Sequence, residues 1–166
     1  ALAAVNPTNN GTWLVRVKDM STPTFNNSEQ DPIAWVFIPK TNTMLISGRF
    51  NGDGSISMFS GDAPQFTVRP MLEIGAGRWE LKMNNYTPAD GVLIISAEGE
   101  GNYNLDNTVT YEPTAAGDGW EIQSRDTPGM GLQTPAGAVG EPEAGCSFGF
   151  VPAPTAGVTC TPAEKL

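Results

Sequence analysis

Residues 78–97 read Arg-Trp-Glu-Leu-Lys-Met-Asn-Asn-Tyr-Thr-Pro-Ala-Asp-Gly-Val-Leu-Ile-Ile-Ser-Ala, and two segments within this stretch decide the fold class. Arg78–Met83 alternates polar and apolar residues, which predicts a strand with one face in the core. Val92–Ala97 is a mostly apolar run and the strongest strand signal of the chain, so we expect it to be central in its sheet. The turn-forming segment Pro88–Gly91 separates the two strands.

Segments of the same kind recur along the whole chain between clusters of Gly, Pro, Asn and Asp. The 166 residues include 19 Gly and 14 Pro, and no window of a dozen residues shows helical periodicity. We therefore predict an all-β fold, an antiparallel β-sandwich or jelly roll of about ten short strands. The expected strands are Thr12–Met20, Ile33–Ile38, Met44–Phe50, Ser55–Phe59, Gln65–Ile74, Arg78–Met83, Val92–Ala97, Val109–Tyr111, Trp120–Arg125 and Cys146–Val151.

The sequence also indicates how some of these strands are connected. Ile33–Ile38 is a continuous apolar run between prolines, which predicts a buried strand that forms a hairpin with Met44–Phe50. Asn51–Gly54 contains residues that tolerate positive φ, and it predicts a second hairpin turn. Pro70 interrupts the next segment, Gln65–Ile74, and predicts either an edge strand or a bent strand there.

The chain length predicts one domain over residues 1–166, with its own hydrophobic core. Within it we expect residues 1–11 to form a flexible N-terminal segment. Residues 126–145 are rich in Pro, Gly and Glu without periodicity, which predicts a long loop. Residues 146–160 are expected to form a C-terminal segment closed by a disulfide.

This disulfide would join Cys146 and Cys160, the two cysteines of the chain. In the chain-entropy model, a disulfide that closes a loop of this length stabilises the folded protein by roughly 3 kcal/mol. The bond implies an oxidising compartment, and the sequence thus predicts a secreted or cell-surface protein. Two buried thiols are the alternative, and a zinc site is disfavoured because two thiolates leave half of a tetrahedral shell empty and the chain has no His.

The net charge of −9 excludes one class of partner and leaves others open. A strongly acidic chain repels phosphate backbones, so we expect no nucleic-acid partner. No apolar run reaches the ~18 residues that a membrane-spanning helix needs, so we expect no membrane insertion. The acidity would attract cations, basic polymers or basic protein surfaces, but solubility of an extracellular protein is the simpler explanation for it.

Catalysis is not expected. Zero His residues exclude the commonest general base and metal ligand. A carboxylate-based glycoside hydrolase is the remaining possibility, because two Asp or Glu residues about 5 to 9.5 Å apart suffice for it. The candidates are Glu80, Glu98, Glu100, Glu121 and Asp126.

No cofactor is expected, although a calcium ion is possible. Residues 49–60 match the EF-hand pattern at Asn51, Asp53 and Gly54 but carry Arg49 and Ser60 where the strong acidic ligands belong, so we expect a plain hairpin. Oxygen ligands for calcium could instead come from the turn over residues 98–107, where Glu100 and Asp106 lie. The sequence leaves this metal site undecided.

Two tyrosines are candidates for ligand binding. Tyr86 and Tyr103 lie in polar, turn-like stretches, so we expect exposed rings that could stack on a sugar. The four tryptophans lie on apolar faces of expected strands, and core packing is the simpler expectation for them. They are Trp13, Trp35, Trp79 and Trp120.

Short motifs recur in a fixed order between residues 31 and 152. They are Trp35–Pro39, Gly48–Arg49 with Gly52–Gly54, Gly77–Leu81, Pro88–Ile95, Asp106–Asn107 before Val109–Tyr111, Trp120–Asp126 and Phe148–Pro152. In this order they resemble a recurrent β-rich domain of bacterial secreted and surface proteins, many of which carry a Pro-Glu-Pro-type C-terminal sorting tail. The resemblance implies a non-catalytic part of an exported protein and brings no established ligand or site residue. The cysteine pair and the ending Glu164–Leu166, without an apolar sorting helix, depart from the pattern.

We therefore expect a non-catalytic extracellular or cell-surface β domain for adhesion, surface display or matrix assembly, with another surface or matrix protein as its partner. The alternative is a carbohydrate-binding module that targets a polysaccharide through Tyr86 or Tyr103.

Overall fold

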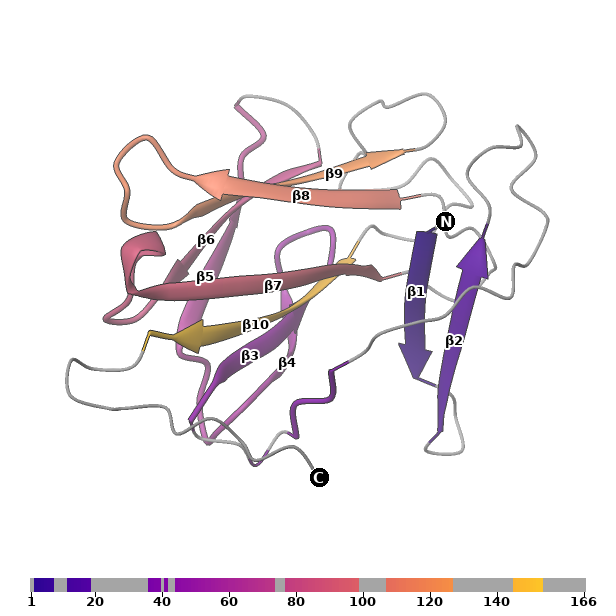
Figure 1. Ribbon diagram of the computed structural model, residues 1–166. Helices are drawn as coiled ribbons and strands as arrows, with labels where there is room; N and C mark the ends of the chain where they lie inside the picture. The colour runs from indigo at the N-terminus through magenta and orange to yellow at the C-terminus, as the bar shows by residue number, and fades with distance from the viewer. Residues whose placement is uncertain are drawn as a thin grey trace, which may run out of the picture.

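A computed structural model describes residues 2–7, 12–18, 36–39, 41, 44–73, 77–98, 107–126 and 145–153 (Figure 1). These residues form an all-β fold in which every pair of neighbouring strands is antiparallel, which confirms the predicted class. A single 3₁₀ turn, η1 (Pro88–Asp90), interrupts them. The strands are β1 (Leu2–Pro7), β2 (Trp13–Lys18), β3 (Ile46–Phe50), β4 (Ile56–Phe59), β5 (Phe66–Pro70), β6 (Arg78–Met83), β7 (Gly91–Glu98), β8 (Asn107–Pro113), β9 (Trp120–Asp126) and β10 (Gly145–Pro152).

Two four-stranded sheets carry most of the structure. One has the order β4-β3-β10-β7 and the other the order β5-β6-β9-β8, and in Figure 1 β8 and β9 of the second sheet are seen above β7 of the first. A separate hairpin of β1 and β2 lies beside the C-terminal end of β7. β5 is an edge strand, one of the two structures that Pro70 predicts, because a proline has no N–H group to donate to a further strand.

The hydrophobic core lies between the two four-stranded sheets. The apolar side chains of β6 point into it as predicted, since Trp79, Leu81 and Met83 are all buried. Aromatic rings make the contact across the gap: Phe50 lies 5.7 Å from Trp79, and Trp120 lies 5.4 Å from Phe150, between ring centroids. The core therefore depends on edge-to-face and tilted ring pairs, which add to the stabilisation from burial alone.

The turn between β3 and β4 links this core to the surface. Gly54 adopts a φ of 84°, and its N–H donates to the Asn51 carbonyl at 2.9 Å, so the predicted hairpin over Asn51–Gly54 is confirmed. The Gly52 carbonyl in the same turn accepts a hydrogen bond of 2.9 Å from the buried Trp79 Nε1. This bond satisfies the polar atom of a side chain that is otherwise surrounded by apolar groups.

β7 is not central, which corrects the prediction for Val92–Ala97. It is an edge strand of the β4-β3-β10-β7 sheet, and its residues alternate between the core and the outer face of the sheet. Leu93 is buried, whereas Val92 and Ile94 are 62% and 44% exposed. An apolar run therefore predicts a strand but not burial of both of its faces, because nothing in the run specifies what covers the outer face.

The predicted strand over Ile33–Ile38 is also wrong for the residues that the structure describes. Val36–Pro39 has no strand structure and makes no hairpin with β3, which pairs with β4 and β10 instead. Val36 is 63% exposed and Phe37 57% exposed. The flanking prolines, which the prediction took as the ends of a strand, are equally compatible with an irregular segment, because proline cannot donate to a ladder.

Other predictions fall at or beyond the limits of the described residues. Leu2–Pro7, expected to be part of a flexible segment, forms β1 and pairs with β2. The predicted loop lies mostly outside the described residues, and so does Cys160. The structure shows no disulfide among the residues it describes, and the predicted bond from the buried Cys146 to Cys160 stays a prediction.

Candidate interaction surface

Tyr86 was predicted as an exposed ligand-binding ring, and the structure places it against the core. Its backbone forms a bridge with Met83, and its ring centroid lies 5.4 Å from that of Phe150. The residue is half-buried and packs against the hydrophobic cluster, so one side of the ring is already covered. Tyr103, the second candidate, lies outside the described residues.

The structure brings two of the candidate carboxylates together. Glu80 on β6 and Glu121 on β9 are directly opposite each other on the outer face of their sheet. Each is held in an ion pair: Arg69 donates to Glu80 at 3.2 Å and Arg78 donates to Glu121 at 2.9 Å. These carboxylates balance the charge of neighbouring cations. Glu100 lies outside the described residues, as do the side chains of Glu98 and Asp126.

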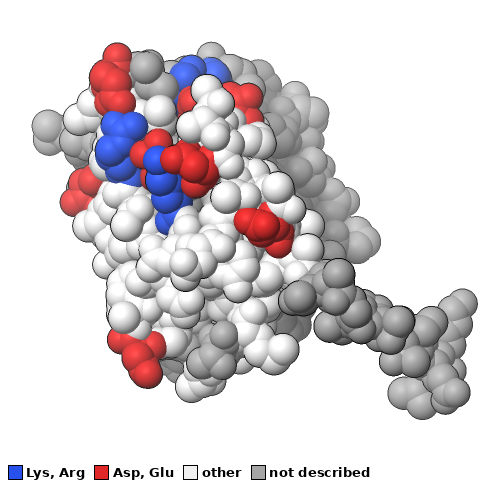
Figure 2. All heavy atoms as spheres, turned by 90° about the vertical axis from the view of Figure 1, so that its left-hand side faces the viewer, with Lys and Arg blue, Asp and Glu red and all other residues white. Residues whose placement is uncertain are grey.

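This outer face of the β5-β6-β9-β8 sheet carries a continuous network of charged side chains. Arg69 bonds Glu73 at 2.6 Å as well as Glu80, and Lys82 bonds Asp118 at 2.7 Å. The hydrogen bond from Arg69 lowers the pKa of Glu73, and the bond from Lys82 lowers the pKa of Asp118. In Figure 2 the blue and red atoms gather over this part of the molecule, at the top of the view, so this outer face is solvated and paired within the chain.

The outer face of the β4-β3-β10-β7 sheet has the opposite character. Val92 on β7 lies directly opposite Val151 on β10, and Ile94 lies opposite Gly149 on the same two strands. The three large side chains, those of Val92, Ile94 and Val151, are all exposed. We call the outward side chains of β3, β4, β7 and β10 the apolar face. Those described are Ser47, Arg49, Met58, Val92, Ile94, Ser96, Ser147, Gly149 and Val151.

The irregular segment Val36–Pro39 packs on the apolar face through one side chain. A Cβ atom added to Gly149 would lie 2.4 Å from the Cδ1 atom of Ile38, so the Ile38 side chain occupies the space directly above this glycine. Gly149 is buried as a result, although it belongs to the outward-facing positions of β10. The apolar face thus already binds an aliphatic side chain from within its own chain.

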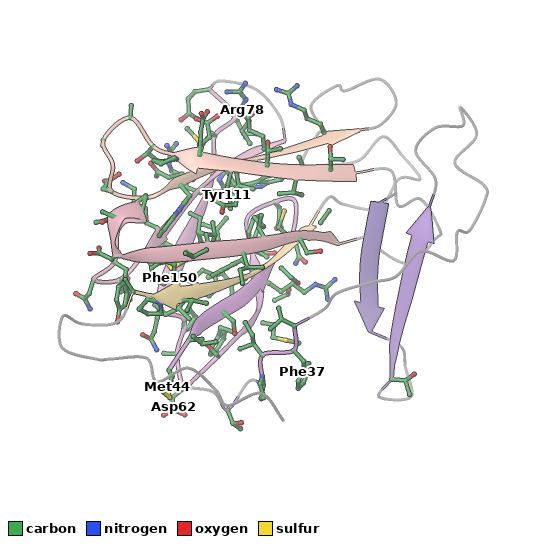
Figure 3. The ribbon with its side chains drawn as sticks, viewed as in Figure 1. Phe37, Met44, Asp62, Arg78, Tyr111 and Phe150 are labelled. Atoms are coloured by element: carbon green, nitrogen blue, oxygen red, sulfur yellow. The ribbon has the colours of Figure 1, made fainter. Side chains whose placement is uncertain are left out.

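More exposed apolar side chains surround this contact. Phe37 points outward below β3, and Met44 lies at the lower tip of the molecule (Figure 3). Met58 on β4 faces outward opposite Arg49 on β3. The exposed Val92, Ile94 and Val151 form an aliphatic cluster on β7 and β10, and clusters of this kind mark contact surfaces when they are large.

Neither a metal nor a membrane can be assigned to the described part of the chain. It contains no group of three or more His, Cys, Asp or Glu side chains placed to hold a metal ion. Glu100 and Asp106, the predicted calcium ligands, lie outside it. No helix within the described ranges is long and apolar enough to cross a bilayer.

Comparison with known proteins leaves the structure as the basis for any assignment. No family model, no curated protein and no solved structure matches the chain.

The sequence analysis missed the apolar face although its signal was present. Val92 and Ile94 belong to the run that predicted a central strand, and alternate residues of this run now prove to be exposed. An apolar residue at every position of a strand has two explanations, which are burial on both faces or an exposed binding face. Strand order separates the two, and strand order comes only from the folded structure.

Proposed function

We propose that this chain is a non-catalytic secreted or cell-surface β domain that acts in adhesion, surface display or matrix assembly through its apolar face. One observation carries the proposal: the two outer faces of the sheets differ, since one is covered by paired charges and the other by exposed Val92, Ile94 and Val151. Exposed apolar surface of this kind costs free energy in water, so a protein contact that covers it is favourable.

The same proposal includes the finer description of the fold and its origin. We infer that the two sheets form a β-sandwich, which the ring contacts between them support. Three pairs of consecutive strands, β3–β4, β5–β6 and β8–β9, form hairpins. In each hairpin both strands belong to the same sheet, which favours a plain sandwich over a jelly roll. The motif order between residues 31 and 152 supports a place among bacterial secreted and surface domains.

A polysaccharide as the ligand is less well supported than a protein surface. Sugar rings stack on exposed, flat aromatic faces, and the described candidate, Tyr86, packs against Phe150. Val92, Ile94 and Val151, the large exposed side chains on β7 and β10, are aliphatic and offer a sugar no hydrogen bonds. Protein surfaces bind such groups readily because both partners lose apolar area to water.

A retention experiment with two matched variants tests this proposal. The immobilised domain is offered a panel of purified extracellular proteins and a panel of insoluble polysaccharides. Ile94→Lys places a charge on the apolar face, and Thr110→Lys places the same charge at an exposed outward position of β8 on the other sheet. We expect protein retention that Ile94→Lys abolishes and Thr110→Lys leaves intact. Saturable glycan binding that survives Ile94→Lys would overturn the proposal.

A further inference from the structure

We propose that Tyr111 on β8 protects the free edge of β7 against pairing with a further strand. The proposal concerns the backbone edge of this sheet and does not depend on the function of the apolar face. An unprotected strand edge presents a row of N–H and C=O groups to any extended segment, so folded β proteins block their edges. The two four-stranded sheets end in the edge strands β4, β5, β7 and β8.

Three of these edges are blocked by features of their own strands. β5 ends on Pro70 and β8 ends on Pro113, and a proline has no N–H group for a further strand. In both strands the residue after the proline makes a ladder-type hydrogen bond to the neighbouring strand or its turn, so the proline nitrogen faces the open side. β4 has only four residues, and the register of its pairing with β3 shifts between Arg49 and Phe50.

β7 is the edge that lacks such a feature. It has eight residues, Gly91–Glu98, contains no proline and pairs with β10 in one unbroken register. Its segment Val92–Ala97 is uncharged and rich in β-branched residues, a composition that favours the addition of strands. A further strand would therefore pair most readily at this edge.

The free backbone groups of β7 belong to alternate residues. The Ala153 N–H donates to the Asp90 carbonyl at 2.6 Å, and this pair continues the register between β10 and β7. Hydrogen-bonded and non-hydrogen-bonded pairs alternate along an antiparallel ladder. Leu93 and Ile95 are an odd number of residues from Asp90, so their N–H and C=O groups point away from β10 toward the open side.

Tyr111 covers this open side from the other sheet. Its hydroxyl donates to the Leu93 carbonyl, one of the free groups of the edge, at 2.7 Å. In Figure 3 Tyr111 lies between β8 and β7, two edge strands that are close to each other although no ladder joins them in the described structure. The Tyr111 side chain thus occupies the place at which an added strand would pair with Leu93, and it must be displaced before a strand can add.

The assembly of purified variants tests this protection. Tyr111→Ser removes the ring and the hydrogen bond, whereas Tyr111→Phe removes the hydroxyl alone. Tyr86→Phe is the matched control, because the Tyr86 hydroxyl bonds no residue that the structure describes. Thioflavin fluorescence and light scattering follow assembly at raised salt, which screens the repulsion between copies of charge −9.

We expect Tyr111→Phe to assemble about fivefold faster than the unchanged protein, the factor by which one typical hydrogen bond shifts an equilibrium. Tyr111→Ser should assemble faster still, because the ring is lost as well. Tyr86→Phe should assemble at the rate of the unchanged protein. Equal rates for Tyr111→Ser and the unchanged protein would overturn the proposal.

Two further measurements separate loss of protection from loss of stability. In the assemblies, hydrogen exchange in the β7 peptide 91–98 should be slower than in the soluble domain, since an added strand binds the N–H groups of Leu93 and Ile95. Ser96→Lys adds a charge at an exposed position of β7 and should slow the assembly of Tyr111→Ser without raising its melting temperature. Slower exchange confined to strands other than β7, or assembly that Ser96→Lys leaves unchanged, would also overturn the proposal.

Discussion

Ser124 and Ser60 are two buried hydroxyl groups with opposite surroundings. The Ser60 hydroxyl accepts a hydrogen bond from the Ser47 N–H and donates to the Leu45 carbonyl, both at 3.0 Å. Ser124 faces the core from β9, and its hydroxyl has no hydrogen-bond partner within the described structure. A buried hydroxyl without a partner loses its bonds to water and gains nothing in return.

Ser124→Ala should therefore raise the free energy of unfolding by about 1 kcal/mol, since it removes an unsatisfied polar atom and little volume. Ser60→Ala is the matched control and should lower the same quantity by about 1 kcal/mol, because it leaves the Ser47 N–H without its acceptor. Urea denaturation followed by tryptophan fluorescence measures both. Destabilisation of similar size in the two variants would show that the Ser124 hydroxyl has a partner.

Residue-level sequence reasoning succeeded where a local pattern determines the environment. The alternation in Arg78–Met83 placed Trp79, Leu81 and Met83 correctly in the core. The same reasoning could not identify Tyr86 as half-buried. The chain turns at Asn85, which has a φ of 66°, and the backbone of Tyr86 then bridges to Met83. This geometry directs the Tyr86 ring toward Phe150. A polar, Asn-rich stretch predicts such a turn but not the direction of the next side chain.

At the scale of elements, β10 contacts the segment 36–39 at Gly149, and the contact depends on this residue having no side chain. Ile38 lies above Gly149, so any larger residue at this position of β10 competes with Ile38 for the same space. Ile38 belongs to an irregular segment that makes no ladder hydrogen bonds with the sheet. Substitution at Gly149 should therefore release this segment rather than unfold the domain.

Gly149→Val should speed chymotrypsin cleavage after Phe37 several-fold while it lowers the free energy of unfolding by less than about 1 kcal/mol. Gly48→Val on the neighbouring strand β3 is the matched contrast. A Cβ atom there would meet the Phe66 ring inside the core, and the expected loss is about 1–3 kcal/mol. Mass spectrometry of the fragments gives the cleavage rate, and an unchanged rate in Gly149→Val would contradict the assigned contact.

The strands could be predicted from sequence more fully than their places in the sheets. Segments with alternation and turn residues, such as Ser55–Phe59 and Trp120–Arg125, gave strands near the expected positions. The order of strands follows from contacts between segments far apart in the chain, such as β3 with β10, and no local pattern encodes it. This is why β7 was predicted as central and why the apolar face was not foreseen.

For the whole molecule, the acidic groups set how stability responds to pH. Hydrogen bonds from Ser55 and Thr87 lower the pKa values of Asp53 and Asp90, as those from Arg69 and Lys82 lower the pKa values of Glu73 and Asp118. A carboxyl group with a lowered pKa in the folded state stabilises the fold above its unfolded pKa. This contribution is lost as the pH falls through the folded pKa.

We therefore expect the melting temperature to be level near neutral pH and to fall as the pH drops below about 4. Asp90→Asn should reduce the slope of this fall, because Thr87 donates two hydrogen bonds of 2.7 Å to the Asp90 carboxylate. Asp62→Asn removes an equal charge from a carboxylate with no hydrogen bond among the described residues, so it is the control. A slope in Asp90→Asn equal to that of the control and of the unchanged protein would contradict this explanation.

The pairing of β3 with β10 determines how the domain responds to a pulling force. β3 begins at Ile46 and β10 runs past its partner Phe150, so the chain enters and leaves the sheet at the same end. Tension on these two ends loads the residue pairs one after another, starting with Ile46 and Phe150, instead of sharing the force among all of them. Under such tension the sheet would open from one end, one residue pair at a time, and would absorb work gradually over a long extension.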